Sequence, residues 1–198
     1  MRVSRAQAEQ NRREVVSAAG RLFRERGFDG VGLSELMGAV GLTQGGFYKQ
    51  FKSKNDLVVE SCSRALTDST ETWRRMVNDD DVPDAFAALV GQYLSKFHRD
   101  STGSSCLFAS LGPDAARHSS DLRSSFEVTL KAYGEILGEA MNASLPHAGH
   151  EDPLVVFSTM VGALLLSRVV NDEQLSNRIL ESSAKSLLDR SLADEPLD

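Results

Sequence analysis

The segment at residues 33–54, LSELMGAVGLTQGGFYKQFKSK, constrains the fold more than any other part of the chain. Its first half predicts a short helix with one buried face, because apolar residues recur at helical spacing: Leu33, Leu36, Met37 and Val40. Ser34 is placed to cap the first turn of this helix. Gly41 then breaks the helix, and Thr43 can cap a second helix that runs to Phe51. Two short helices joined by a glycine-containing turn predict a helix-turn-helix, whose second helix reads DNA in the major groove.

The charge of the chain is distributed unevenly. The 198 residues carry a net charge of −6, which alone would argue against a nucleic-acid partner. Residues 1–56, however, contain ten Lys/Arg and six Asp/Glu, a balance of +4, whereas the remainder has twelve basic and twenty-two acidic residues, a balance of −10. A basic N-terminal part on an acidic body fits contact with phosphates at one end of the chain only.

Helical periodicity continues along the rest of the chain and predicts an all-α protein. A first helix at 7–26 and the two helices of the motif form a three-helix domain, residues 1–53. It is small for an independent domain and should therefore pack on the C-terminal part of the chain. A larger helical domain, residues 54–198, is expected to contain a long helix from residue 54 into the acidic run at 79–81, followed by five more helices: 83–99, 105–116, 119–144, 153–170 and 172–192. Loops are expected at 99–105 and 146–153, and a frayed tail at 193–198.

Several classes of protein are disfavoured by what the sequence contains. Cys62 and Cys106 lie far apart without metal-ligand spacing, which fits a reducing cytosol better than a disulfide framework. The apolar run at 153–170 is interrupted by polar residues and is short for a membrane span of ~20 residues. His147 and His150 lie near acidic residues, but the histidines show no convincing ligand spacing. We therefore expect a cytoplasmic protein with no metal, no cofactor and, in the absence of catalytic signatures, no enzyme activity.

Residues 18–57 carry a run of spaced motif matches. They contain A-x-x-L-F in the first helix, Gly-Phe after it, a Gly-Leu-Thr turn, and G-x-F-Y-x-x-F-x-S-K at residues 45–54. In these features the chain resembles the TetR family of bacterial transcriptional regulators. Weaker similarity extends to residues 104–117 and 161–180 of the C-terminal part. The resemblance implies that the C-terminal domain binds a small ligand and dimerises through its last two helices.

Candidate DNA contacts lie at the start of the second motif helix. The Gln44 amide can bond bidentately to adenine, and Thr43 can act as a cap, a phosphate contact or a contact to a thymine methyl group. The resemblance implies phosphate contacts for Tyr48 and Lys54, and places Lys49 where histidine is common in the family. The predicted DNA-binding residues are Ser34, Thr43, Gln44, Gly45, Tyr48, Lys49 and Lys54.

The two consecutive glycines of this helix weaken it but also allow a close approach to DNA. Gly45 and Gly46 each disfavour a helix by about 1 kcal/mol relative to Ala. Their missing side chains, however, allow the backbone to approach DNA closely. Phe47 and Phe51 are expected to face the three-helix core instead.

A second set of residues is a candidate ligand site between the C-terminal helices, where helical bundles often bind small molecules. The set is spread over four or five predicted helices and consists of Trp73, Phe97, His98, Cys106, Phe108, Phe126, Tyr133, Phe157 and Met160. Most of these residues would also be needed to fill a hydrophobic core. Their type and spacing therefore do not separate a ligand site from packing.

Cys106 has two interpretations. It follows Gly103, Ser104 and Ser105 and begins a predicted helix, and a helix start favours the thiolate, which reacts with oxidants and electrophiles. A cysteine can equally be a small packing residue. The first interpretation predicts a thiol sensor and the second predicts none.

These features favour a homodimeric, ligand-responsive regulator that binds a palindromic operator, since a two-fold dimer presents its two reading helices to successive major grooves. A repressor that a small-molecule or thiol-reactive effector releases from the operator is the favoured form. One alternative is a constitutive, architectural DNA-binding protein with a purely dimerising C-terminal domain. Another is a ligand-binding or enzymatic helical domain that carries a vestigial motif.

Overall fold

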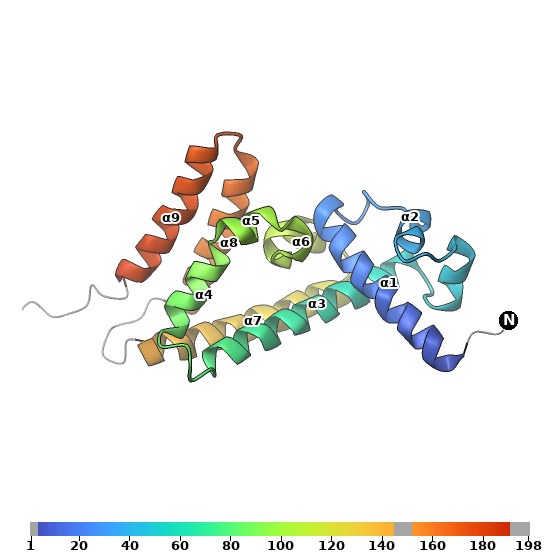
Figure 1. The fold of residues 1–198 in the computed structure, drawn as a ribbon, viewed down its shortest axis with the longest axis horizontal. Coiled ribbons are helices and arrows are strands. Elements are labelled where there is room, and N and C mark those ends of the chain that lie inside the picture. The colour runs from blue at the N-terminus through green and yellow to red at the C-terminus, as the bar shows by residue number, and fades with distance from the viewer. Residues whose placement is uncertain (1–3, 145–151, 191–198) are drawn as a thin grey trace, which may run out of the picture. The chain divides into compact units, whose positions relative to one another are not determined.

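The computed structural model describes residues 4–144 and 152–190, and they confirm the all-α prediction (Figure 1). The elements in chain order are α1 (Arg5–Arg26), α2 (Leu33–Gly38), the 3-10 helix η1 (Gln44–Lys49), α3 (Lys54–Val77), α4 (Ala85–Tyr93), α5 (Lys96–Asp100), the 3-10 helix η2 (Thr102–Ser104), α6 (Leu107–Ala116), α7 (Ser120–Ser144), α8 (Pro153–Val169) and α9 (Glu173–Arg190). The tail at 193–198 and most of the predicted loop at 146–153, with His147 and His150, lie outside the described residues. Within the described part, no helix combines the length and apolar character that a membrane crossing requires.

The chain forms two compact units. The first contains the residues up to Leu66 together with Thr102–Phe126, and the second contains Thr67–Ser101 and the chain from Glu127 onward. Two helices, α3 and α7, contribute to both units. The predicted boundary of the DNA-binding domain at residue 53 falls inside the first unit and stays a prediction.

Hydroxyl contacts join α3 to α7 within each unit, and the two helices run parallel, side by side (Figure 1). In the first unit the Ser63 and Ser125 Oγ atoms lie 2.8 Å apart. In the second unit the Ser69 Oγ lies 2.6 Å from the phenolic oxygen of Tyr133. Both pairs are half-buried, so each supplies polar side chains with a partner inside a largely apolar seam.

The core of the first unit shows why three helices alone are insufficient. Buried apolar residues of α1, α2 and η1 pack in one cluster with the first half of α3. Helix α6 and the start of α7 complete the cluster with five more residues: Leu107, Leu111, Ala115, Leu122 and Phe126. The prediction that the small N-terminal domain packs on the C-terminal part is therefore confirmed, and part of its core lies some fifty residues further along the chain.

The predicted loop at 99–105 is wrong, because this stretch contains the end of α5 and the whole of η2. The η2 segment lies against α1 at Gly103. A Cβ atom on Gly103 would fall 2.5 Å from the Glu25 Oε1 and 2.7 Å from the Arg21 Cγ. The missing side chain thus allows the backbone to approach α1, which holds a segment whose composition alone predicts a loop.

The single helix predicted at 83–99 is divided in two. Helix α4 is capped at its start by Asp84, whose carboxylate accepts the backbone N–H of Ala87 at 2.9 Å, and ends at Tyr93, before the C-cap Leu94. A new helix then begins at once, because the Ser95 hydroxyl accepts the backbone N–H of His98 at 3.0 Å and caps α5. Side-chain caps therefore decided these boundaries, whereas apolar periodicity runs across them.

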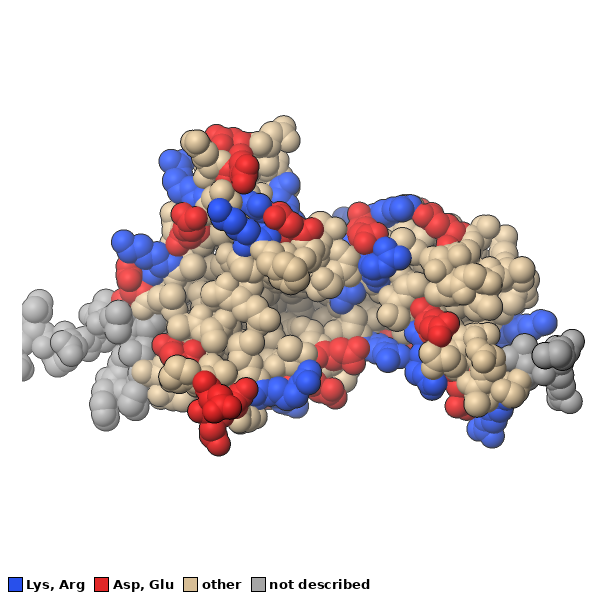
Figure 2. Space-filling view, viewed as in Figure 1, with Lys and Arg blue, Asp and Glu red and all other residues tan. Residues whose placement is uncertain are grey.

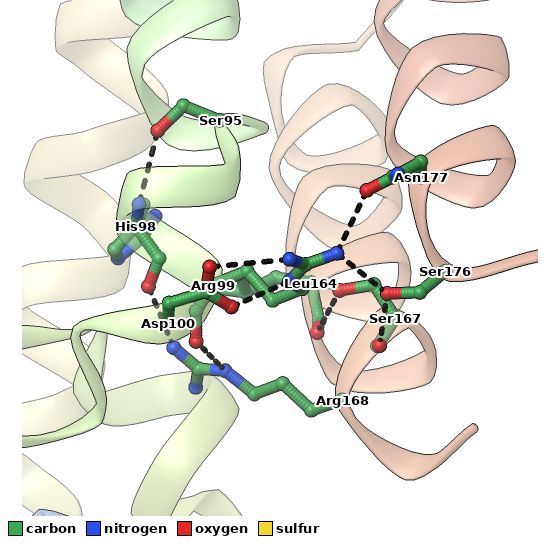
Figure 3. A network of polar contacts seen from close by, with 9 residues as sticks. All are labelled: Ser95, His98, Arg99, Asp100, Leu164, Ser167, Arg168, Ser176 and Asn177. Atoms are coloured by element: carbon green, nitrogen blue, oxygen red, sulfur yellow. Dashed lines mark hydrogen bonds and ion pairs between the residues drawn. The ribbon is translucent and has the colours of Figure 1, made fainter. Parts of the chain in front are cut away.

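Two arginines connect α5 to α8 and α9 in the second unit (Figure 3). The Arg99 guanidinium donates to the Ser176 Oγ and to the Asn177 Oδ1, both at 2.9 Å. The Arg168 guanidinium donates to the backbone carbonyls of Arg99, at 2.9 Å, and of His98, at 2.8 Å. These charge-assisted bonds satisfy the carbonyls at the end of a five-residue helix and fix its position.

Candidate DNA-binding surface and effector site

The turn of the helix-turn-helix depends on Gly41. Its φ is +69°, in the left-handed region that a residue without Cβ adopts at little cost. This conformation directs the backbone N–H of Leu42 to the carbonyl of Met37, at 2.9 Å. The turn places η1 after α2 as the sequence predicts.

The second element of the motif is shorter and tighter than predicted. Its hydrogen bonds include Gly46 N–H to the Thr43 carbonyl and Gln50 N–H to the Phe47 carbonyl, each at 2.9 Å and each spanning three residues. The predicted α-helix up to Phe51 is therefore wrong, and a six-residue 3-10 helix takes its place. Two consecutive glycines lower the intrinsic helical stability here, and the 3-10 helix found in this place is short, with six residues.

Both predicted side-chain caps of the motif are also wrong. Thr43 occupies the N-cap position of η1, but its side chain makes no capping hydrogen bond. Ser34 lies inside α2, which begins two residues earlier than a Ser34 cap requires, after Gly32 in extended conformation. By contrast, the expected cap of α3 is present, since the Ser53 Oγ accepts the backbone N–H of Asp56 at 3.1 Å.

Buried aromatic rings hold η1 in place. Phe47 and Phe51 are 0% and 3% exposed, and their rings stack with centroids 5.3 Å apart. Gly46 lies close to α2, because a Cβ atom there would be 3.6 Å from the Met37 Cε. The prediction that the two phenylalanines face the core is confirmed, and they supply the stability that the glycines do not.

Arg12 of α1 connects three elements around the end of η1. Its guanidinium donates to the Gln50 carbonyl and forms an ion pair with Glu60 of α3. The same group lies over the Phe51 ring, 4.3 Å from its centroid. Arg12 thus satisfies a carbonyl that the short η1 leaves at its C-terminal end, and neutralises a half-buried carboxylate.

Sequence reasoning missed Arg12 as a positioning residue. It lies three and four residues before Val15 and Val16, which begin the buried face of α1. A cation in register with an apolar face is the signal that could have identified it.

The predicted DNA contacts surround η1 on the surface of the first unit. Tyr48 is 66% exposed and leans with its ring edge on Phe47, at 5.2 Å between centroids. Lys54, the first residue of α3, is half-buried. The other predicted contacts are all exposed: Ser34, Thr43, Gln44, Gly45 and Lys49. In the face that Figure 2 shows, basic side chains of the N-terminal part alternate with acidic ones, so cations next to η1 matter more than total charge.

Four aromatic residues pack together inside the second unit. The Trp73 ring stacks on Tyr133 at 4.3 Å between centroids, and Phe157 meets the same Tyr133 ring at 5.1 Å. Tyr93 of α4 contacts both Trp73 and Phe157. The structure therefore brings three of the predicted effector-site residues together, and adds Tyr93, which the spacing of Phe86, Leu89, Val90 and Tyr93 marks as a buried position.

The remaining predicted effector-site residues have different environments. His98 packs its ring on Tyr93 at 4.7 Å, and burial lowers the pKa of its imidazole. Met160 is fully buried in α8. Phe97 is 81% exposed, so the prediction that it lines an interior site is wrong; it lies on the short helix α5, none of whose residues is buried.

The other three members of the predicted set belong to the first unit. Cys106 immediately precedes α6, and the rings of Phe108 and Phe126 meet at 5.0 Å between centroids. The residues grouped by composition therefore divide between two units.

The two cysteines differ sharply in accessibility. Cys62 is completely buried in α3, and burial raises the pKa of its thiol to about 12. Cys106 is half-buried at the N-cap of α6. Only the second is placed to meet a reagent from solution, because a protonated, enclosed thiol is a poor nucleophile.

Comparison with known proteins agrees with this geometry. The model of bacterial regulatory proteins of the tetR family matches residues 15–60, from the buried face of α1 to the first turns of α3. The HTH-type transcriptional repressor NemR of Escherichia coli (strain K12) is 27% identical over 182 residues, which cover 86% of this chain and 92% of NemR.

Solved structures share the fold over most of the chain. The crystal structure of reduced E. coli NemR has a TM-score of 0.77 and 24% identity, and the match covers 91% of this chain and 96% of that one. The crystal structure of AibR in complex with isovaleryl coenzyme A and operator DNA has a TM-score of 0.65 and 17% identity, and covers 89% and 97%.

The match to this family model and the similarity to NemR indicate a DNA-binding transcriptional regulator. The chain is similar to the TetR family of bacterial regulatory proteins, whose model matches residues 15–60. This family consists of regulators and not of enzymes, in agreement with the motif content of the sequence.

The Arg12 contacts lead to a stability prediction. Arg12→Met should lower the free energy of unfolding by about 1–3 kcal/mol, because the Gln50 carbonyl and the Glu60 carboxylate both lose a charged partner. Urea denaturation followed by circular dichroism measures this. Arg13→Met is the matched control, since within the described part of the chain the neighbouring guanidinium bonds to the exposed Gln10 alone, and its loss should change stability by less than about 0.5 kcal/mol. Equal effects of the two substitutions would contradict the role of Arg12.

Proposed function

We propose that the protein is a repressor that binds a palindromic operator as a homodimer and leaves it when an effector binds or modifies the C-terminal part. The exposure of polar and cationic residues on η1, an element fixed by buried phenylalanines and by Arg12, carries this proposal. An exposed reading element on a rigid support is what sequence-specific DNA recognition requires. NemR, similar to this chain over most of its length, is a repressor.

Two kinds of DNA contact follow from the chemistry of these side chains. Gln44 begins η1, and its amide carries the donor and acceptor that an adenine edge presents in the major groove. Lys54 begins α3, and its ammonium group suits a phosphate, which positions the protein without reading sequence. Thr43, Gly45 and Tyr48 are exposed and would contact the DNA backbone around them.

A homodimer is supported by the surface of α8. This helix buries one side in the second unit, whereas five large apolar residues are exposed on the other: Leu154, Val155, Leu165, Leu166 and Val169. Their spacing places them on one stripe of the helix, together with the small residues Ser158 and Gly162. A long apolar stripe of this kind needs a partner, and a second copy of α8, flanked by α9, supplies a self-complementary one.

Effector response has two possible sources in this chain. The related fold of AibR was crystallised with isovaleryl coenzyme A and operator DNA, which supports a small-molecule effector for the present protein. Cys106, half-buried at the start of α6, supports a thiol-reactive one. Helix α6 also contributes Leu107, Leu111 and Ala115 to the core beneath the reading element, so a modification at its start would act within the same compact unit.

Release from DNA requires two states with different effector affinity. Helix α3 is continuous between the two units, with Leu57 in the core of the first and Trp73 among the aromatic rings of the second. An effector that favours another packing of those rings would thereby change the support of η1. The alternative, a constitutive architectural protein, would bind DNA equally well with every effector.

Base reading and phosphate binding should separate by mutation. Gln44→Ala should reduce discrimination between the operator and a scrambled duplex by about 1–3 kcal/mol, because a bidentate base contact is lost. Lys54→Ala should weaken binding to both duplexes and lower the slope of log Kobs against log salt by about 0.9 for each protomer. Gel-shift titrations on duplexes selected from a random pool measure both quantities. An unchanged specificity ratio in Gln44→Ala would exclude it as a base contact.

The oligomeric state should depend on the exposed stripe of α8. Leu166→Glu places a charge in the proposed interface, so the protein should sediment as a monomer and lose cooperative binding to the two half-sites. Val128→Glu is the matched control, since this exposed valine lies on α7 and its substitution should leave the dimer intact. A dimeric Leu166→Glu protein in analytical ultracentrifugation would show that another surface associates.

The thiol-reactive form of the effector hypothesis is tested with N-ethylmaleimide on the operator complex. The reagent should release the wild-type protein and the Cys62→Ala variant, because the buried Cys62 thiol, with its pKa of about 12, stays protonated. Cys106→Ser should bind the operator normally and resist release. Release of Cys106→Ser at the wild-type rate would leave a small-molecule effector as the surviving hypothesis.

A further inference from the structure

The first turns of α1 extend beyond the core that the rest of this helix covers. Helix α1 begins at Arg5, whereas its first buried residue is Val15. All residues from 4 to 10 are exposed. We refer to residues 4–11 as the α1 overhang. Within the first unit nothing apolar accounts for its length, since its only apolar side chains are Ala6 and Ala8.

The overhang continues the inner face of α1 toward the reading element. Arg5 precedes Arg12 by seven residues, so the two guanidinium groups emerge from the same side of the helix about 10 Å apart along its axis. Arg12 marks where that side points, because it contacts the Gln50 carbonyl at the end of η1 and the Phe51 ring. Arg5 therefore lies on the side of α1 that faces the end of the reader, two turns further out.

Among the described residues, the side chains of the overhang hydrogen-bond only to near neighbours on α1. Arg5 is paired with Glu9 at 3.3 Å, and the Gln7 amide donates to Asn11 at 2.8 Å, both within one exposed turn. Exposed pairs of this kind contribute little and are exchanged readily for a stronger ligand. Arginine and amide side chains beside a DNA-reading element suit phosphate oxygens, whereas a protein partner would require apolar surface.

We propose that the α1 overhang is a second DNA-contacting element, in which Arg5 binds a backbone phosphate beside the half-site that η1 reads. The inference rests on the proposed operator binding. Glu9 lies on nearly the same side of the helix, one turn further on, and it opposes this contact by repelling phosphate. The overhang thus sets affinity through two neighbouring charges of opposite effect and adds no base reading.

Because Arg5 and Glu9 carry opposite charges on one face, their substitutions should change the affinity for DNA in opposite directions. A general loss of folding could not tighten binding, so the test separates a DNA contact from a folding defect. Arg5→Gln should weaken binding about fivefold at 0.1 M salt to operator and scrambled duplex alike, and should lower the salt slope by about 0.9 for each protomer. Glu9→Gln should act in the opposite direction and tighten binding to both duplexes. Fluorescence anisotropy of labelled duplexes over a salt series measures affinity and slope together.

The chain contains a matched control pair on the same helix. Arg21 and Glu25 form an ion pair with the same spacing, at 3.2 Å, beside η2 and on the side of α1 away from Arg12. Arg21→Gln and Glu25→Gln should change the affinity for DNA far less than the overhang variants do. If substitutions in the two pairs had equal effects, Arg5 would act only through the net charge of the protein. That result would overturn a direct contact between Arg5 and a phosphate.

The remaining outcomes are also decisive. Unchanged affinity in both overhang variants overturns the inference while leaving operator binding by the wild-type protein intact. A shift from dimer to monomer in Arg5→Gln, seen by sedimentation, would identify the overhang as a protein interface instead. A wild-type protein that selects no sequence from a random pool and binds no duplex at low salt refutes the proposed function itself.

Discussion

The contacts of Arg12 are the constraint on which the DNA-binding surface depends. A six-residue 3-10 helix with two consecutive glycines has little stability of its own. Its shape is imposed from outside, by phenylalanine rings below it and by a guanidinium that joins its last carbonyl to α1 and α3. The shape of the proposed DNA-binding surface is therefore a property of packing among distant segments, and only secondarily of the local sequence.

The positions of most helices could be predicted from the sequence, because apolar residues recur at helical spacing over long segments such as α3 and α7. The Ser53 cap and the buried faces of Phe47 and Phe51 were predictable for the same local reasons. Errors arose where local preferences compete. Two glycines weaken the helix where the structure has the 3-10 helix η1, and the Ser95 hydroxyl caps a new helix inside an uninterrupted apolar pattern.

Contacts between distant segments lay beyond prediction from the sequence. Nothing in the neighbourhood of Arg12 shows that Glu60 and the Gln50 carbonyl will meet it. Likewise, the aromatic residues chosen for an effector site share a composition, but the fold divides them between two units and leaves Phe97 outside. Residue type predicts which chemistry a chain carries, whereas topology decides which members of the set come together.

The apolar stripe of α8 has a consequence for the lifetime of the protein. If a second copy covers it, folding and assembly are coupled by mass action, and the free energy of unfolding rises with the concentration of the chain. A dilute chain then leaves this face in water, where it favours aggregation and recognition by proteases. The number of copies present would thus set how long each one survives, with a longer lifetime at higher concentration, and this dependence needs neither DNA nor effector.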